Sequence, residues 1–385
     1  MTCPEILQAF QHRFGSTPRL FRAPGRVNLI GEHTDYNDGY VFPMALDRYT
    51  TVAVAPRDDR KVRAYSANME EETTLHLDTL ARRGHWSDYV AGIASQLEKR
   101  GVRLPGADLF LYSDVPVGSG LSSSAALEIS SALAFLSLAD SHLPGEELAR
   151  LGQAAENQFV GMNCGIMDQF IAVHGAQDHA LFLDCRSLEY QLVPLPSDHS
   201  RIVVCNTMVK HELGASEYNN RRRECEEGVQ RMQKHWPAIR ALRDLDLEQF
   251  TRVEGELDET VRKRCRHVIS ENERVLESIR SLRSGDLHHF GSLMNASHDS
   301  LRDDYQVSCE ELDLMVGIAR GIPDCLGARM TGGGFGGCTV NLVERSAVDS
   351  FCREIGTLYR SRTGLEPAIY ISVPSQGAHE WSSTK

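Results

Sequence analysis

The sequence lacks long apolar runs, and this excludes one class of protein at the outset. A membrane-spanning helix needs about 18 apolar residues, and the longest apolar run here, near residues 132–139, is far shorter. The first fifteen residues, MTCPEILQAFQHRFG, have no apolar core and carry Pro and Glu early, so they do not resemble a secretory signal. We therefore expect no membrane partner.

Closely paired cysteines are also missing. The chain has 10 cysteines, but no two of them form a C-x-x-C pair. This scatter favours buried, reduced thiols over disulfides or a zinc site. A reducing compartment, the cytoplasm, is the expected location.

An excess of positive charge is absent too, because the net charge is −12. An acidic field repels polyphosphate backbones, so nucleic acid is not an expected partner. A small anionic ligand is still possible in a local positive pocket built from backbone N–H groups, a helix N-terminus or a metal ion.

Two common nucleotide-binding signatures do not occur. A P-loop requires Gly-Lys, and the chain contains no Gly-Lys pair. The H-R-D and D-F-G motifs of protein kinases are likewise missing.

The 385 residues are enough for two domains. The turn-rich stretch at residues 194–198 suggests a division into 1–195 and 196–385. Strands and helices mix without a strict βαβ rhythm, which predicts an α+β fold rather than a doubly wound sheet. The expected strands are residues 46–55, 107–112, 180–183, 201–205, 339–343 and 368–373, and the expected helices are residues 122–139, 146–160 and 215–233.

The run DVPVGSGLSSSAA, residues 114–126, follows a predicted strand and opens a predicted helix. Glycines let the backbone approach a ligand, and the helix N-terminus adds about half a positive charge. Serine hydroxyls add donors and could ligate Mg²⁺. This arrangement suits a triphosphate, although an ordinary Gly-rich turn with serine caps explains the run equally well.

A second glycine-rich run, MTGGGFGGC, spans residues 330–338. Gly332, Gly334 and Gly337 match G-x-G-x-x-G, the dinucleotide fingerprint, in letters only. That fingerprint must follow a strand and open a helix of a βαβ unit, whereas here a strand is expected to follow. We expect a glycine-lined wall that allows close backbone approach, rather than a nicotinamide site.

The run GRVNLIGEHTDYNDG, residues 25–39, clusters Glu32, His33 and Asp35 after an apolar stretch. Carboxylates and imidazole suit ligands rich in hydroxyl groups. A metal site is less favoured, because the i, i+4 spacing of helical metal ligands is absent. A capped turn at residues 37–39 is the simplest structural explanation.

Two acidic residues, Glu156 and Asp168, flank a Gly-containing turn after a predicted helix. Alone they carry little information, since a helical Glu is usually solvated. Together with Ser124, Glu156 offers a hydroxyl and a carboxylate, which phosphate oxygens and waters would complete into a Mg²⁺ shell.

These segments, in this order, resemble the GHMP small-molecule kinases. GRVNLIGEHTDYNDG closely matches the signature of the galactokinase family, and the runs at residues 114–126 and 330–338 match the second and third GHMP motifs. The resemblance extends from about residue 23 to the C-terminus. It implies a ribosomal protein S5 domain 2-like domain followed by a ferredoxin-like domain, with the active site between them.

The resemblance also implies a reaction, in which the γ-phosphoryl group of ATP passes to the anomeric hydroxyl of α-D-galactose with Mg²⁺ as cofactor. Asp168 would act as the base, with Arg26 beside it to keep the carboxylate ionised. The residues implied at the sugar are Glu32, His33, Thr34, Asp35, Gly165 and Tyr218. Those implied at ATP are Ser66, Trp86, Gly118, Ser119, Gly120, Leu121, Ser122, Ser123 and Ser124, with Ser124 and Glu156 on Mg²⁺.

Other functions compete with this one. An N-acetylgalactosamine kinase would need only one altered pocket side chain, a difference of about 1–3 kcal/mol, although Thr34 and the turn at 37–39 favour galactose. A non-catalytic sensor of galactose and ATP is disfavoured because residues 122–126, Arg26 and Asp168 are intact. The sequence does not define an oligomeric state, and a monomer is compatible with it.

Overall fold

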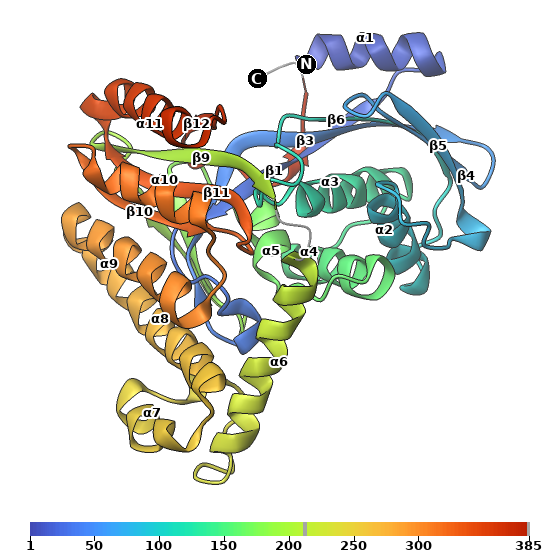
Figure 1. Cartoon of the computed structure of the whole chain (residues 1–385). Helices are drawn as coiled ribbons and strands as arrows, with labels where there is room; N and C mark the ends of the chain where they lie inside the picture. The colour runs from blue at the N-terminus through green and yellow to red at the C-terminus, as the bar shows by residue number, and fades with distance from the viewer. Residues whose placement is uncertain (211–213, 383–385) are drawn as a thin grey trace.

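The computed structural model describes residues 1–210 and 214–382 and shows an α+β fold of two domains, as predicted (Figure 1). Within these residues the helices are α1 (Cys3–Phe14), α2 (Asp88–Lys99), α3 (Ser123–Leu138), α4 (Gly145–Ala155), α5 (Met167–His174), α6 (Gly214–Met232), α7 (Leu247–Val253), α8 (Glu259–Ser284), α9 (Leu287–Ser300), α10 (Glu310–Gly321) and α11 (Val348–Thr363). None of them combines the length and apolar character that crossing a bilayer requires.

The first domain is built on a six-stranded sheet. Its order is β13 (His379–Glu380), β1 (Arg19–Asn28), β3 (Pro43–Arg57), β6 (Gly106–Ser113), β4 (Lys61–Ser66) and β5 (Glu71–His76). All neighbours pair antiparallel except β4 and β6, which are parallel. The predicted strands 46–55 and 107–112 lie in β3 and β6, and the predicted helix 122–139 is α3, so these expectations are confirmed.

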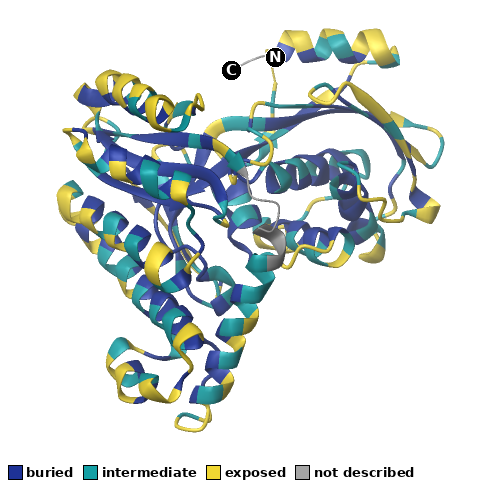
Figure 2. Cartoon of the chain, in the orientation of Figure 1, coloured by how far each residue is buried: buried dark blue, intermediate teal, exposed yellow. Residues whose placement is uncertain are grey.

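Helices cover both faces of this sheet. The apolar residues of α2, α3 and α4 pack with one face into a single core, and α1 packs on the other face. The buried positions form a continuous band through the sheet in Figure 2. Helix α3 is apolar around most of its circumference because it is enclosed between the sheet and its neighbouring helices.

The second domain contains a four-stranded antiparallel sheet in the order β10 (Cys325–Thr331), β11 (Gly336–Glu344), β9 (Ser200–Lys210) and β12 (Ala368–Ser372). Helices separate β9 from β10 and β11 from β12, which gives the expected ferredoxin-like arrangement. Helices α10 and α11 pack on one face. Helices α8 and α9 pack on the other, together with apolar residues of β1 and β3 from the first domain.

The two domains therefore share a core. A small sheet of β2 (Tyr40–Val41), β7 (His179–Asp184) and β8 (Tyr190–Pro194) lies beside it. The last strand, β13, returns to pair with β1 at the edge of the first sheet. The division of the chain at residue 195 stays a prediction.

One predicted helix ends early. Residues 146–160 were expected to be one helix, but α4 ends at Ala155 and a single π-helical turn, Glu156–Val160, follows. Such turns shift the register of the side chains that follow them. Here the turn begins at Glu156, which lines the main cavity.

Candidate active site

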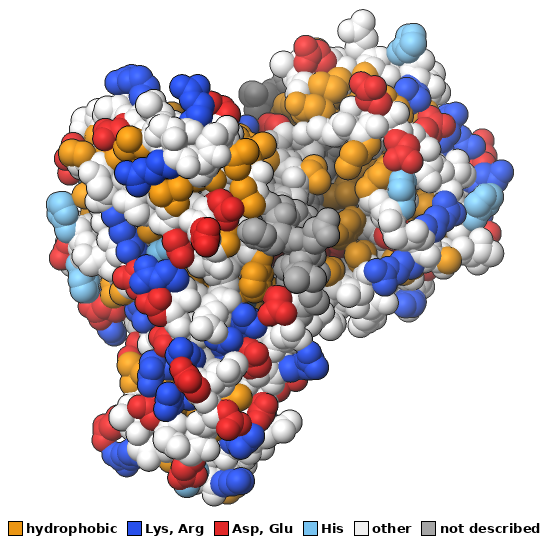
Figure 3. All heavy atoms as spheres, in the orientation of Figure 1, with side chains coloured by type: hydrophobic (Ala, Val, Ile, Leu, Met, Phe, Trp, Pro, Cys, Tyr) orange, Lys and Arg blue, Asp and Glu red, His pale blue; other side chains and the backbone are white. Residues whose placement is uncertain are grey.

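A cavity of about 650 Å³ lies between the two domains. Figure 3 shows hydrophobic side chains in the hollow between the two lobes. The predicted residues that line the cavity are Arg26, Glu32, His33, Asp35, Ser66, Trp86, Gly118, Gly120, Ser122, Ser123, Ser124, Glu156, Gly165, Asp168 and Tyr218. The fold thus brings together segments that are more than 180 residues apart in the sequence.

Three predicted residues lie outside the lining. The hydroxyl of Thr34 is fully buried, 2.6 Å from the carbonyl of Tyr40 and 2.8 Å from that of Gly31, so it closes the turn. Ser119 donates to the carbonyl of Pro116 at 2.8 Å. Leu121 packs in the core shared by the two domains.

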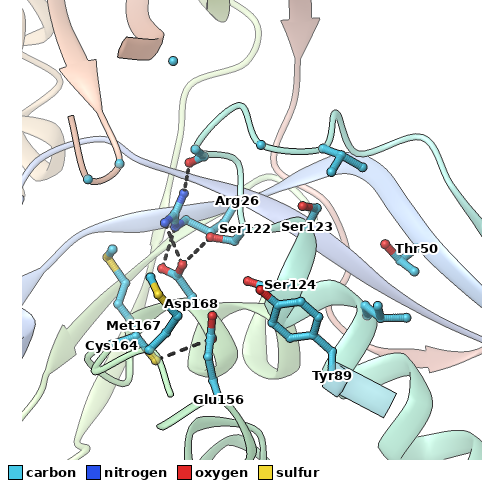
Figure 4. Close-up of a pocket in the computed structure, with 18 of the residues that line it drawn as sticks. Arg26, Thr50, Tyr89, Ser122, Ser123, Ser124, Glu156, Cys164, Met167 and Asp168 are labelled. Carbon is cyan, nitrogen blue, oxygen red and sulfur yellow. Dashed lines mark hydrogen bonds and ion pairs between the residues drawn. The ribbon is translucent and has the colours of Figure 1, made fainter. Parts of the chain in front are cut away.

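Asp168, in the first turn of α5, is held by two side chains from other elements (Figure 4). Arg26 on β1 donates Nε to Oδ1 and Nη2 to Oδ2, both at 2.7 Å. Ser122, the residue that precedes α3, donates its hydroxyl to Oδ2. The remaining guanidinium nitrogen of Arg26 donates to the carbonyl of Gly120 at 2.6 Å. The carboxylate is therefore fixed beside the Gly/Ser loop.

The Gly/Ser loop holds a backbone conformation that most residues avoid. Ser122 has φ of 59°, in the left-handed region, and Gly118 and Gly120 have φ of 72° and 80°. A non-glycine residue with positive φ carries local strain, which tends to persist where function requires it. This conformation turns the chain into the N-terminus of α3, where free N–H groups favour an anion.

The second glycine-rich run is the turn of the β10–β11 hairpin and no helix follows it, so the dinucleotide interpretation is excluded. Its glycines pack against the Gly/Ser loop. A Cβ on Gly332 would lie 3.0 Å from the carbonyl oxygen of Gly120, and one on Gly337 would lie 2.9 Å from that of Ser119. Both glycines have positive φ, 85° and 86°. The glycine-lined wall is thus confirmed as a close backbone contact between the two domains.

Glu32 sits in a buried network that the sequence did not predict. One carboxylate oxygen accepts from Asn28 at 3.0 Å and from Arg329 at 2.8 Å, and the other accepts from the amide of Gly332 at 2.7 Å. Arg329 is fully buried and also donates to the carbonyl of Asn28 at 2.8 Å. Asn28 lies within the motif at residues 25–39, and Arg329 directly precedes the run at residues 330–338.

Asp35 packs directly against Gly165. A Cβ at position 165 would lie 1.8 Å from a carboxylate oxygen of Asp35, so only glycine fits there. Burial, and then the negative charge of Asp168, raise the pKa of Asp35 to about 7. Asp35 and Asp168 thus differ in environment although both line the cavity: Asp168 is paired with the Arg26 guanidinium, whereas among the described residues no ion pair of Asp35 is found.

His33 is anchored by a chain of hydroxyl groups. Its Nδ1 lies 2.7 Å from the hydroxyl of Tyr36, which lies 2.8 Å from that of Tyr305. Burial, followed by neighbouring positive charges, lowers the pKa of His33 to about 3. The imidazole is therefore neutral at pH 7 and can donate from only one nitrogen.

Glu156 and Ser124 both line the cavity and lie near each other (Figure 4). Gln169, which the sequence did not single out, donates its amide to Glu156 at 2.7 Å and to the buried Glu128 at 2.9 Å. Burial, and then the charge of Asp168, raise the pKa of Glu156 to about 7. A nearby cation would favour its ionised form.

A carboxylate and a hydroxyl are hard oxygen donors that fit Mg²⁺ when phosphate and water supply the other ligands. Among the described residues there is no group of three or more His, Cys, Asp or Glu side chains that could hold a metal ion by themselves. The rival metal site at Glu32, His33 and Asp35 is therefore not supported.

Comparison with known families agrees with this geometry. Residues 88–176 match the model of the GHMP kinases N terminal domain, and residues 278–361 match that of the GHMP kinases C terminal domain. The fold and the site thus define a GHMP kinase. Residues 8–56 match the galactokinase galactose-binding signature.

Individual relatives show to which family of GHMP kinases the chain belongs. A galactokinase of Roseiflexus sp. is 50% identical over 375 residues, covering 97% of this chain and 96% of the relative. A galactokinase of Chloroflexus aggregans is 51% identical and covers 94% of each chain. The crystal structure of Lactococcus lactis galactokinase complexed with galactose aligns with a TM-score of 0.95 at 38% identity, covering 98% of this chain and 99% of that one. The chain belongs to the galactokinase family.

Proposed function

We propose that this chain transfers the γ-phosphoryl group of ATP to the C1 hydroxyl of α-D-galactose, giving galactose 1-phosphate and ADP. One observation carries the proposal. Asp168 is fixed by Arg26 and Ser122 at the point where the Gly/Ser loop and the run of residues 31–39 meet in one cavity. A base, a phosphate cradle and a set of groups suited to hydroxyls therefore share one space.

Asp168 is assigned the role of base. Its carboxylate accepts the proton of the sugar hydroxyl while the hydroxyl oxygen bonds to the γ-phosphorus, and the bond from that phosphorus to the bridging oxygen breaks, so that ADP leaves. Phosphoryl transfer gains most from positioning and from neutralising charge. Arg26 serves both needs, because it fixes the carboxylate geometry and contributes a positive charge.

The remaining residues of the cavity are assigned to the sugar, to ATP or to Mg²⁺. We assign the sugar to Glu32, His33, Asp35, Gly165 and Tyr218, with Thr34 shaping the loop that carries them. We assign ATP to Ser66, Trp86 and the loop from Gly118 to Ser124, whose buried members Ser119 and Leu121 set its path. Ser124 and Glu156 would hold Mg²⁺, which when bound neutralises phosphate charge.

All ten cysteines are free thiols, which supports a cytoplasmic location, where such thiols stay reduced.

ADP release with Mg·ATP tests the function directly. The acceptors to compare are galactose, N-acetylgalactosamine, glucose, homoserine and mevalonate. The proposal predicts turnover with galactose and little with the others. Faster turnover with N-acetylgalactosamine would make that sugar the preferred substrate and contradict the assignment of galactose. Binding of galactose and ATP without turnover would indicate a sensor and contradict the proposal.

A further inference from the structure

Helix α8 runs alongside the loop between β1 and β2, which carries Glu32, His33 and Asp35 (Figure 1). Residues 31–40, which are most of this loop and the first residue of β2, have little regular structure beyond one 3₁₀ turn; they are called the 31–40 loop below. A loop of this kind does not hold side chains in place by itself, so its backbone needs partners elsewhere.

Three residues of α8 supply those partners. A carboxylate oxygen of Glu271 accepts from the amide of Gly31 at 2.9 Å. The side-chain oxygen of Asn272 accepts from the amide of Tyr40 at 2.8 Å. Nε2 of His267 lies 3.1 Å from the carbonyl oxygen of Glu32, and it is the donor of that pair because a carbonyl only accepts. The helix thus grips the loop at both ends.

We propose that His267, Glu271 and Asn272 are positioning residues that fix the 31–40 loop, and with it Glu32 and His33, in the geometry that binds the sugar. This inference rests on the proposed function. None of the three residues lines the cavity, so they act through the loop rather than on a substrate.

The contacts between α8 and the loop are buried, and one of them is made by a charged carboxylate. Glu271 and His267 are fully buried and Asn272 is nearly so. Glu271 also accepts from Ser297 at 2.6 Å and from Nε of Arg274 at 2.6 Å. Although burial opposes ionisation, Arg274 and its other partners lower the pKa of Glu271 to about 2. Hydrogen bonds to a buried charge are stronger than neutral ones.

Steric fit prevents the loop from shifting along the helix. A Cβ on Gly39 would lie 2.5 Å from the side-chain oxygen of Asn272, and a Cβ on Gly31 would lie 2.9 Å from Val275 on the same helix. On its other side the loop is held through the contacts of Glu32 with Arg329 and Gly332. Glu32 is therefore fixed between α8 and the β10–β11 hairpin.

The variant Glu271→Gln probes this grip with little change of shape. One end of a glutamine amide is a donor, so it must face either Arg274 or the amide of Gly31, both of which are donors themselves. We expect the KM and the calorimetric Kd for galactose to rise about tenfold, because a hydrogen bond to a charged group is lost. The KM for ATP should stay within about twofold, since α8 contributes no residue to the cavity lining.

Val268→Ala is the matched control. Val268 is fully buried on the same helix, but it packs in an apolar core cluster that contains no residue of the 31–40 loop. It should lower Tm and leave both KM values unchanged. The proposal is overturned if Glu271→Gln and Asn272→Ala both change Tm but neither changes the galactose KM, or if Glu271→Gln raises the two KM values equally, because either result describes scaffold residues.

Two further measurements keep the inference testable if Glu271→Gln does not fold. Asn272→Ala removes only the acceptor for Tyr40 and should raise the galactose KM severalfold, while an unchanged value contradicts the proposal. In the wild-type protein, slow hydrogen exchange at the amides of Gly31 and Tyr40 is expected, and fast exchange contradicts a fixed loop. Absence of turnover in wild type with every sugar would instead refute the proposed function, and the exchange result would still stand.

Discussion

Arg26 and Asp168 form a two-point contact, with Nε and Nη2 of the guanidinium each 2.7 Å from a different carboxylate oxygen. The contact joins β1 to α5 across 142 residues of sequence and is nearly closed to solvent on the arginine side. A planar fork of this kind fixes the orientation of the carboxylate and places a positive charge beside it. The reactivity of Asp168 should therefore depend on the shape of its partner.

Arg26→Lys tests that dependence. Lysine keeps the positive charge but lacks the planar fork whose three separate nitrogens serve the two carboxylate oxygens and the carbonyl of Gly120. We expect kcat to fall about ten- to a hundredfold, the equivalent of one lost charge-assisted hydrogen bond. Steady-state kinetics with saturating galactose and ATP measure this. A kcat equal to that of wild type would show that charge alone suffices.

Gly337→Ala tests the contact between the two glycine-rich loops. Alanine at a positive φ costs about 1–2 kcal/mol, and here its Cβ would also lie 2.9 Å from the carbonyl of Ser119. We expect a loss of stability together with a higher KM for ATP, because the Gly/Ser loop must move.

Gly285→Ala is the control for that substitution. Gly285 has φ of 77° and no atom within 4 Å of an added Cβ, so it carries the backbone penalty alone. Chemical denaturation of both variants should show the larger loss for Gly337→Ala. Equal losses and equal KM values for ATP would mean that the loops do not depend on each other.

Asp35 should make stability depend on pH in a defined direction. Burial and the charge of Asp168 raise its pKa from 3.8 to about 7, so between about pH 4 and pH 7 the folded protein holds a proton that the unfolded chain has released. The contribution of Asp35 to stability is thus present below about pH 4 and is lost as the pH rises to about 7.

Asp35→Asn removes this titration. Relative to wild type, the variant should gain stability as the pH rises across that window, measured as the difference in Tm between the two proteins at each pH. A difference that is constant with pH would show that Asp35 has an ordinary pKa in the folded protein.

The elements that the sequence predicted correctly are those with strong local signals. The β-branched run at residues 46–55 and the small, apolar residues from Ser123 onward decided β3 and α3 from local pattern alone. The strand β1 was not predicted, because Pro24 and Gly25 interrupt its pattern. In the structure, a shift in the register of its pairing with β3 accommodates these two residues. The π-helical turn at Glu156 has no local signature, so residues 146–160 were expected to be one helix.

The residues of the site were also predictable only where their sequence signal is local. Compact motifs identified the two glycine-rich loops and the acidic residues of the cavity, because their spacing is local, whereas lining residues such as Thr50 and Tyr89 belong to no motif. The partners of those residues lie far away in the sequence: Arg329 reaches Glu32 across 297 positions and Glu271 reaches Gly31 across 240. A single sequence contains no record of such pairs, since tertiary packing alone creates them.

The central claim is that Asp168 carries the chemistry, and Asp168→Asn tests it most directly. Asparagine nearly matches aspartate in shape but cannot accept the proton, so kcat for galactose should fall by about a hundredfold or more. The protein should still fold and bind galactose, with a lower Tm because an amide donor then faces Arg26. Asp140→Asn, at an exposed position outside the cavity lining, is the control and should behave as wild type. A folded Asp168→Asn protein with near-normal kcat would contradict the account.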